Sequence, residues 1–348
     1  MKLFIVAPHF PPSALPPAQR VRLMMPHLKK LGVEATVFTT SPRNREERED
    51  PWMLELAGND YELIEVKCIS QKWSRKLGFG DLGLRMLPFL FFKLWQQIKR
   101  KRPDFILYPV PPWYILLIAP ILKKFNGVPY AIDFIDPWVA GGELSVDASF
   151  KKKMSQWIAI KLEGFVTKNA SLIYSVSDGI NEQLIKRHPD LKCKQMYAIP
   201  YGAEQSDYFV SASKKSERKE VLIRYIGAVW EDAYPTLGSL FSALSEINHP
   251  FHFELYGTSY SGEGLAKPQL NKWLTTNELQ GKVKEYPARV AYREAVELNM
   301  ESDILLLFGG MQPYYAASKL FGLIVSQKPF IAFLHRDSFP AKFLKSFN

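Results

Sequence analysis

Two aspartates near the end of a predicted strand are candidates for proton chemistry. Asp133 and Asp136 flank the carboxyl end of the apolar run YAIDFI. A carboxylate at this position could orient a hydroxyl group or accept its proton. Asp136 also stands directly before Pro137, where it could cap a turn or a helix instead. The sequence alone leaves both roles open, and we treat the two aspartates as candidate catalytic residues.

Glycine turns and a cation in the second half of the chain could bind a phosphate group. Gly227 closes the apolar run VLIRYIG and Gly257 closes FHFELYG, so each lies where a strand turns toward a helix. Backbone amides at such turns can approach an anion closely. Ser318 and Lys319 stand at the predicted start of a helix over 317–326, where the lysine would add a positive charge beside a bound phosphate group. The alternatives are plain tight turns and a lysine that extends from a helix end into solvent.

A proline-rich loop near the amino terminus carries two further candidates. His9 lies in the loop, and Arg20 follows it on a helix predicted over 18–31. Arg20 could contact a phosphate group of a ligand, or it could form a salt bridge at the surface. A single histidine in a loop is more often structural than catalytic, and we retain His9 as a candidate ligand contact.

The composition is that of a globular protein with two full-sized cores. The 348 residues are 47% hydrophobic and 23% charged, and domains of about 150 residues would divide this length into two. Disordered, collagen-like and disulfide-stapled chains are excluded. Cys68 and Cys193 form no CxxC motif, so we expect no metal site. The first apolar run is too short for a signal peptide, and two reduced cysteines fit a cytoplasmic location.

Positive charge is concentrated in one region. The chain has a net charge of +10, and the segment 72–124 holds eleven Lys and Arg against two Asp. Within it, apolar residues at intervals of three and four predict a helix over 84–102 that ends in four basic residues. Three interpretations remain: a core helix with a solvated basic end, an interfacial helix at an anionic membrane, or a nucleic-acid surface. The third is the weakest, because the aromatic residues form one block instead of alternating with the cations, and we expect no nucleic acid partner.

Two patterns are set aside. Residues 78–83 fit G-x-G-x-x-G, but the segment before them is polar and basic, so we predict a flexible loop and no dinucleotide site. Residues 106–122 are the most apolar stretch. They contain four prolines, which predict a strand, a turn and a short buried helix in place of a membrane span.

Strands and helices alternate along the chain, which predicts an α/β fold with parallel sheets. We expect two doubly wound, Rossmann-like domains, 1–205 and 206–348, that face a cleft, with a polar linker at 211–220. The predicted strands are KLFIVA, EATVFTT, ELIEVKC, DFILYPV, PYAIDFI, SLIYSV and KQMYAI, followed by VLIRYIG, FHFELYG, KVKEYPA, DILLLFG and PFIAFL. Beyond those given above, the predicted helices are 150–168, 236–247, 265–276 and 290–300.

Several segments together resemble family 4 glycosyltransferases, which use nucleotide sugars and have the GT-B fold. They follow the family's order and span nearly all of the chain. The segment from Asp133 to Trp138 resembles the Asp-x-Arg-Asp-Pro-Trp of members that build surface polysaccharides. The matching segments are APHFPPSALPPAQRVRLMMPHLKKLGVEATVFTT, DFIDPW, SVSDGINEQL, IPYGAEQSDYF and SDILLLFGGMQPYYAASKLFGLIVSQKPFIAF.

The resemblance implies an activity and a set of site residues. It implies a hexosyltransferase that moves a sugar, with retention of configuration, from a UDP- or GDP-linked donor to a glycan or lipid-linked acceptor, with no other cofactor. It places Arg289 in the loop that lines the nucleobase, Gly322 in the donor site, and Trp138 with His9 and Arg20 on the acceptor side. It also implies polysaccharide biosynthesis at the cytoplasmic face of a membrane. The interfacial-helix interpretation given above would add a peripheral membrane contact through residues 84–102.

The sequence departs from the family pattern at three places. Two glutamates of the donor site correspond here to Tyr314 and Gly322, and the turn after Gly227 has Trp230-Glu231-Asp232 where the family has Arg and Lys. The chain also ends at Asn348, before the last helices of the family, which predicts an incomplete second domain. A catalytically silent protein that binds a nucleotide, a glycan or a partner subunit is therefore the alternative function.

Overall fold

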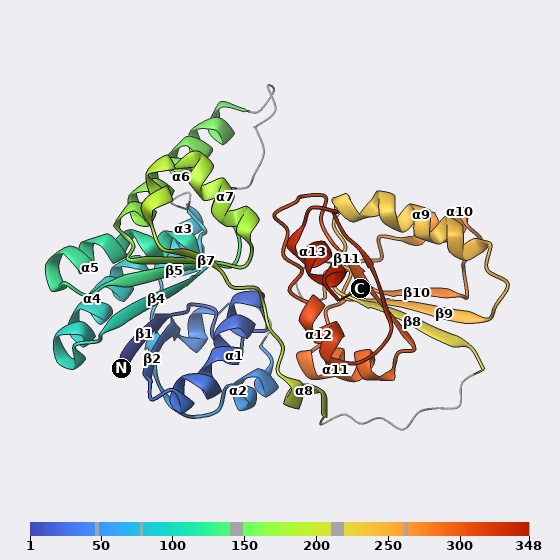
Figure 1. The fold of residues 1–348 in the computed structure, drawn as a ribbon, viewed down its shortest axis with the longest axis horizontal. Coiled ribbons are helices and arrows are strands. Elements are labelled where there is room, and N and C mark those ends of the chain that lie inside the picture. Colours follow the sequence, from blue (N-terminus) through green and yellow to red (C-terminus); the bar gives the residue numbers. More distant parts are fainter. Residues whose placement is uncertain are drawn as a thin grey trace. The chain divides into compact units, whose positions relative to one another are not determined.

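The chain folds into two compact units, Met1–Pro200 and Tyr201–Asn348, which we call unit 1 and unit 2 (Figure 1). The computed structural model describes residues 1–45, 49–76, 79–139, 149–209, 219–259, 261 and 264–347. The division falls between residues 200 and 201, whereas the sequence placed it after residue 205. Most of the predicted linker 211–220 lies outside the described residues.

Unit 1 is built on a seven-stranded sheet in the order β3-β2-β1-β4-β5-β6-β7, with every neighbouring pair parallel. The direction of winding reverses between β1 and β4, which makes that point of the sheet a natural ligand site. All seven predicted strands are confirmed. They are β1 Lys2–Val6, β2 Glu34–Thr40, β3 Tyr61–Val66, β4 Phe105–Val110, β5 Tyr130–Phe134, β6 Leu172–Ser175 and β7 Met196–Ala198.

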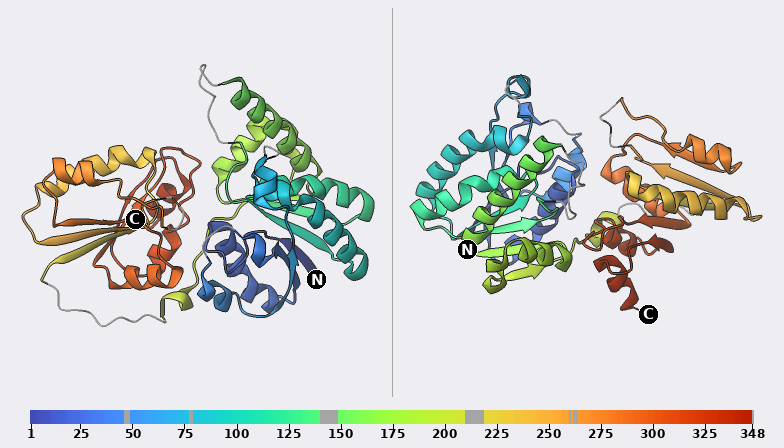
Figure 2. Two further views of the ribbon diagram at one scale, coloured as in Figure 1. Left: turned by 180° about the vertical axis from the view of Figure 1, so that it is seen from behind. Right: turned by 90° about the horizontal axis from the view of Figure 1, so that it is seen from above.

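Helices connect these strands and cover both faces of the sheet (Figure 2). Right-handed crossovers place α1 on one face and the helices that follow β3, β4 and β5 on the other. The helices are α1 Pro16–Lys30, α2 Pro51–Ala57, α3 Gln71–Lys76, α4 Leu82–Lys101, α5 Ala119–Asn126, α6 Phe150–Asn169 and α7 Asp178–Arg187, with 3-10 turns η1 Pro42–Asn44, η2 Trp113–Ile118 and η3 Pro189–Cys193.

The basic helix of the sequence analysis is α4. Its buried stripe includes Leu90, Leu94 and Ile98, while Phe89 and Phe92 on the other side are exposed. The apolar stretch 106–122 forms β4, η2 and the start of α5, as predicted. Within the described ranges of the chain, no helix combines the length and the apolar character that crossing a bilayer requires.

The flexible loop predicted for residues 78–83 is wrong in its second half. The Asp81 carboxylate accepts a hydrogen bond from the backbone amide of Leu84, at 2.9 Å, and thereby caps α4. Residues 82 and 83 are therefore the first turn of a helix. Leu77 and Gly78 lie outside the described residues.

Unit 2 has a five-stranded parallel sheet in the order β10-β9-β8-β11-β12, with its reversal between β8 and β11. All five predicted strands are confirmed as β8 Val221–Ile226, β9 Phe251–Tyr256, β10 Val283–Tyr286, β11 Ile304–Phe308 and β12 Phe330–Phe333. The helices are α8 Gln205–Phe209, η4 Glu231–Ala233, α9 Tyr234–Ser245, α10 Asn271–Thr276, α11 Tyr292–Glu301, α12 Leu320–Val325 and α13 Phe339–Lys345.

The helix predicted over 265–276 begins six residues later, at Asn271. Pro268 disfavours a helical conformation in the residue before it. The Glu285 carboxylate also accepts hydrogen bonds from the backbone amides of Gln269 and Leu270, each at 2.9 Å from Oε2, and this fixes the start of the helix. The helix predicted over 317–326 is likewise shorter, at Leu320–Val325.

A buried ion pair ties α1 to the carboxyl end of β5. Arg20 Nε and Nη2 donate to the two carboxylate oxygens of Asp133, at 2.6 and 3.0 Å, and Arg20 Nη1 donates to the Pro200 carbonyl at 3.0 Å. Both side chains are nearly inaccessible, with 9% and 4% exposure. The surface salt bridge weighed for Arg20 is thus corrected to a buried, bidentate one.

We predict that Asp133→Asn destabilises unit 1 by about 3–5 kcal/mol, because it leaves the Arg20 charge buried without its partner. Urea unfolding at pH 7 measures this loss. The double variant Arg20→Met/Asp133→Leu should recover most of it.

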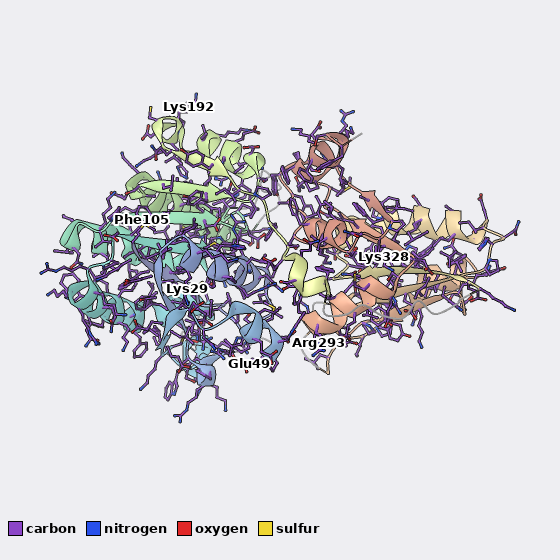
Figure 3. The ribbon with its side chains drawn as sticks, turned by 60° about the horizontal axis from the view of Figure 1, so that its bottom comes forward. Lys29, Glu49, Phe105, Lys192, Arg293 and Lys328 are labelled. Carbon is purple, nitrogen blue, oxygen red and sulfur yellow. The ribbon has the colours of Figure 1, made fainter. Side chains whose placement is uncertain are left out.

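The matched control is Lys29→Met, which breaks the exposed Lys29–Asp60 pair on the surface of α1 (Figure 3) and should cost less than about 1 kcal/mol. Equal losses for Asp133→Asn and Lys29→Met would contradict a stabilising role for the buried pair.

Candidate functional site

The loops after β8 and β9 lie side by side at the carboxyl end of the unit 2 sheet. The Gly227 amide donates to the Tyr256 carbonyl, and the Gly257 amide donates to the Tyr286 carbonyl, each at 2.8 Å. Both glycines have positive φ, 156° at Gly227 and 71° at Gly257, which side chains disfavour. The two predicted glycine turns are therefore adjacent, at the edge where parallel sheets bind ligands.

Lys319 lies directly over the Gly227 turn. It follows β11, serves as the N-terminal flanking residue of α12, and follows Ser318 in the chain. A Cβ atom at position 227 would overlap Lys319 Nζ, so only glycine leaves room for the ammonium group. Because β8 and β11 are the neighbours between which the winding reverses, this lysine lies at the switch point of the sheet.

The ammonium group of Lys319 is held where its charge is disfavoured. Burial, and to a smaller extent the positive charge of Arg289, lower the pKa of Lys319 to about 7. Arg289 reaches the site from the loop after β10, with its Cα 3.6 Å from the position a Cβ of Gly257 would occupy. An anion bound beside Lys319 and Arg289 would relieve both effects.

Four predicted donor residues thus converge in unit 2: Gly227, Gly257, Arg289 and Lys319. Two cations beside two glycine turns fit a pyrophosphate, whose negative charge needs backbone amides and positive side chains. Glu231 and Asp232, the acidic residues noted after Gly227, lie in η4 with both side chains exposed to solvent.

Gly322, the remaining glycine predicted for the donor site, lies beside a tyrosine from another helix. It lies in α12, and a Cβ at this position would overlap the hydroxyl oxygen of Tyr208 from α8. Tyr208 is 5% exposed, so the ring is held in place by its surroundings. The Tyr208 hydroxyl therefore occupies the space that a side chain at position 322 would need.

Sequence reasoning missed Tyr225, whose aromatic ring packs against the Lys319 ammonium group. The Lys319 ammonium lies 4.9 Å from the centre of the Tyr225 ring, within reach of a cation–π interaction. The Tyr225 hydroxyl donates to the Ala228 carbonyl at 2.7 Å and so shapes the turn. Tyr225 lies in the apolar run VLIRYIG, but nothing local in the sequence signals either contact.

In unit 1, Asp136 is the candidate base. Asp133 accepts from Arg20 with both oxygens, so we assign it a positioning role. Asp136 follows β5 with one side open to solvent, yet the surrounding protein excludes enough water to raise the pKa of its carboxyl group. Its carbonyl accepts from Trp113 Nε1 at 3.3 Å, which fixes the backbone after the strand.

Two acceptor candidates are placed by neighbours that the sequence did not suggest. Trp138 is 8% exposed and packs edge-on against Tyr114, with the ring centroids 5.5 Å apart, and its contact with an acceptor stays a prediction. His9, after β1, lies close enough to Asp81 for its charge to lower the pKa of that carboxyl, against a larger rise caused by burial. Across the described ranges, no group of three His, Cys, Asp or Glu residues is arranged to hold a metal ion.

Comparison with known proteins identifies the architecture. A family model described as "Glycosyl transferase 4-like domain" matches residues 17–202. A sequence search of curated proteins gives no significant match.

Solved structures match over the whole chain, with the GT-B fold. Sucrose-phosphate synthase from Thermosynechococcus elongatus has a TM-score of 0.63 at 13% identity, covering 97% of this chain and 82% of that one. Anabaena HepE in complex with UDP-glucose has a TM-score of 0.61 at 14% identity, covering 100% and 88%. An α,α-trehalose-phosphate synthase (UDP-forming) from Burkholderia vietnamiensis has 0.63 at 11%, covering 99% and 86%. At these identities the likeness establishes the fold.

We predict that Lys319→Met raises the melting temperature at pH 6. The folded pKa of about 7 lies below the ordinary 10.5, so the unfolded chain binds the proton more tightly between these values. Stability of the native protein therefore increases as pH rises from 7 towards 10.5, while the methionine variant lacks this dependence. Scanning calorimetry from pH 6 to pH 10 should show the advantage of the variant shrinking. Lys345→Met, at an exposed position of α13, is the control, and a pH-independent difference for Lys319→Met would contradict the prediction.

We predict that Gly322→Ala costs about 1–3 kcal/mol, because the new methyl group overlaps the Tyr208 hydroxyl. In a Tyr208→Phe background the nearest ring atom would be Cζ, at an ordinary 3.5 Å, so the same substitution should be nearly neutral. A double-mutant cycle by urea unfolding measures the coupling. Additive effects of the two substitutions would show that the contact is absent.

Proposed function

The chain belongs to the glycosyl transferase 4-like family, and from that premise we propose that it transfers a hexosyl group from a nucleoside-diphosphate sugar to a glycan or lipid-linked acceptor. The observation that carries the proposal is the position of the Lys319 ammonium group over the Gly227 turn, at the switch point of the unit 2 sheet. A resting lysine with a lowered pKa is poised to gain a proton when a diphosphate binds.

The chemistry that follows is mainly electrostatic. As the bond from sugar to phosphate breaks, negative charge develops on the departing diphosphate. Lys319, Arg289 and the amides near the two glycine turns would stabilise that charge in a partly water-excluded site. Retention of configuration, with a donor phosphate assisting the incoming hydroxyl, is what resemblance to family 4 implies, and we include it in the proposal.

We propose that Asp136 of unit 1 is the base that accepts the proton of the acceptor hydroxyl. Its raised pKa makes it a stronger base than an ordinary surface carboxylate, and the buried Arg20–Asp133 pair holds the end of the same strand rigid. Neither Cys68 nor Cys193 is in a disulfide. We propose a cytoplasmic protein of polysaccharide biosynthesis that acts at the inner face of a membrane.

The donor class rests on the same site. Anabaena HepE, a structural neighbour, is solved with UDP-glucose, so UDP sugars are the first donors to test, with GDP sugars next.

The second candidate function is a catalytically silent protein that binds nucleotide, glycan or a partner subunit. The Tyr208 hydroxyl beside Gly322 favours it, since that space is closed to a glutamate.

We predict that UDP or GDP binds with proton uptake at Lys319. Above pH 7 the free protein loses this proton, so affinity should fall by up to tenfold per pH unit. Isothermal titration calorimetry in two buffers of different ionisation enthalpy measures both affinity and uptake. Lys319→Met should lose at least tenfold in affinity and all of the pH dependence, while Lys345→Met retains both.

A panel of nucleotide sugars, assayed for binding and for hydrolysis, decides between the two functions. Turnover supports the transferase, and binding without turnover supports the silent protein. The proposal is falsified if no nucleotide or nucleotide sugar binds or is hydrolysed.

A further inference from the structure

One helix of unit 1 carries a stripe of exposed apolar side chains. The residues are Phe150, Met154, Trp157, Ile158 and Phe165 of α6, each between 41% and 78% exposed. At 100° per residue, their spacing places all five on one side of the helix. An exposed stripe of this kind on a globular protein marks an interaction surface.

The second half of the helix that carries the stripe is anchored to unit 1. In the second half of α6, the fully buried Glu163 accepts from Arg187 Nε and Nη2 at 2.8 and 2.9 Å, and lies 3.0 Å from His188 Nε2. These contacts fasten the helix to α7 and η3. In the first half, residues 150–155 are all exposed, and this end projects from unit 1 (Figure 1).

The neighbouring helices continue the surface. α4, α5 and α6 pack in sequence, α5 against both of the others. Phe92 of α4 and Phe125 of α5 are 71% and 65% exposed. Trp95 links the two helices, 5.9 Å from the ring of Phe125, and Lys99 Nζ lies 4.8 Å from the Trp95 ring. Lysine and aromatic side chains are combined in the same way on α6, where Lys161 Nζ lies 5.9 Å from the ring of Trp157.

Every exposed charge on these three helices is positive. Together they contain twelve Lys and Arg and a single acidic residue, the buried Glu163. Lys151 and Lys153 flank the apolar stripe, and Lys161 and Lys168 lie within it. Exposed aromatic residues beside lysines on one helix layer match the chemistry of an anionic bilayer surface: rings enter the headgroup zone while the ammonium groups meet phosphate.

We propose that the outer face of α4, α5 and α6 docks unit 1 on an anionic lipid bilayer, with the stripe of α6 as its main apolar contact. A second copy of the chain is disfavoured, because a symmetric contact would bring these cations against one another. The docking stands on this surface alone and does not depend on the sugar transfer proposed above.

The test is flotation of the purified full chain with vesicles of phosphatidylcholine, with and without phosphatidylglycerol. We expect binding to the anionic vesicles only, weakened by high salt. Changing Lys151, Lys152 and Lys153 to Gln should lower the partition constant roughly 100-fold, at about fivefold for each lysine. Phe150→Ser/Trp157→Ser should lower it at least tenfold.

Two controls keep the test specific. Lys30→Gln/Leu31→Ser changes an equally exposed lysine and leucine at the end of α1 and should bind vesicles normally. Lys319→Met should also bind normally, which separates docking from the donor site.

Equal binding to both kinds of vesicle, no binding, or equal losses in the α1 and α6 variants would overturn the proposal. So would sedimentation velocity that shows a dimer abolished by Phe150→Ser/Trp157→Ser, or nucleic acid binding that these apolar substitutions leave unchanged while vesicle binding is absent.

Discussion

The structure of unit 2 depends on one constraint: a lysine ammonium group has to fit against a strand-end turn at the point where the sheet reverses its winding. Glycine at 227 is required, because any side chain would overlap the Lys319 nitrogen. Tyr225 supplies a ring beneath the charge, and Arg289 adds a second cation from the loop after β10. This arrangement costs stability in the free protein, and a cost of this kind is common where an anion is to be bound.

The two units use the same topology for different electrostatic purposes. In unit 1, the arginine near the strand ends is neutralised by a bidentate carboxylate, so Arg20 and Asp133 stiffen the end of β5 and leave Asp136 as the group exposed to a ligand. In unit 2, burial and another cation set the pKa of Lys319, so its charge is available to a ligand. Under the proposed function, the carboxyl end of the unit 1 sheet would bind the acceptor hydroxyl and that of the unit 2 sheet would bind the diphosphate.

Apolar runs were sufficient to predict all twelve strands, and their ends were sufficient to single out Gly227, Gly257 and Lys319, which the structure brings together. Local patterns could not predict contacts between distant segments. Arg20 and Asp133 are 113 positions apart, and the tyrosine that fills the space beside Gly322 comes from a five-residue helix before unit 2's first strand. The late start of α10 has the same origin, since Glu285, on a later strand, fixes it.

Charge is segregated within the chain, and this has a consequence for how the protein meets a surface. Outside α4, α5 and α6, the chain is balanced, with 33 Lys and Arg against 34 Asp and Glu, so the net charge of +10 resides in one layer of unit 1. A neutral body with one cationic face experiences a torque near an anionic surface and approaches it in a single orientation. Because exposed aromatic residues lie on the same helices, the orientation that electrostatic attraction selects is also the one in which apolar burial can hold the protein.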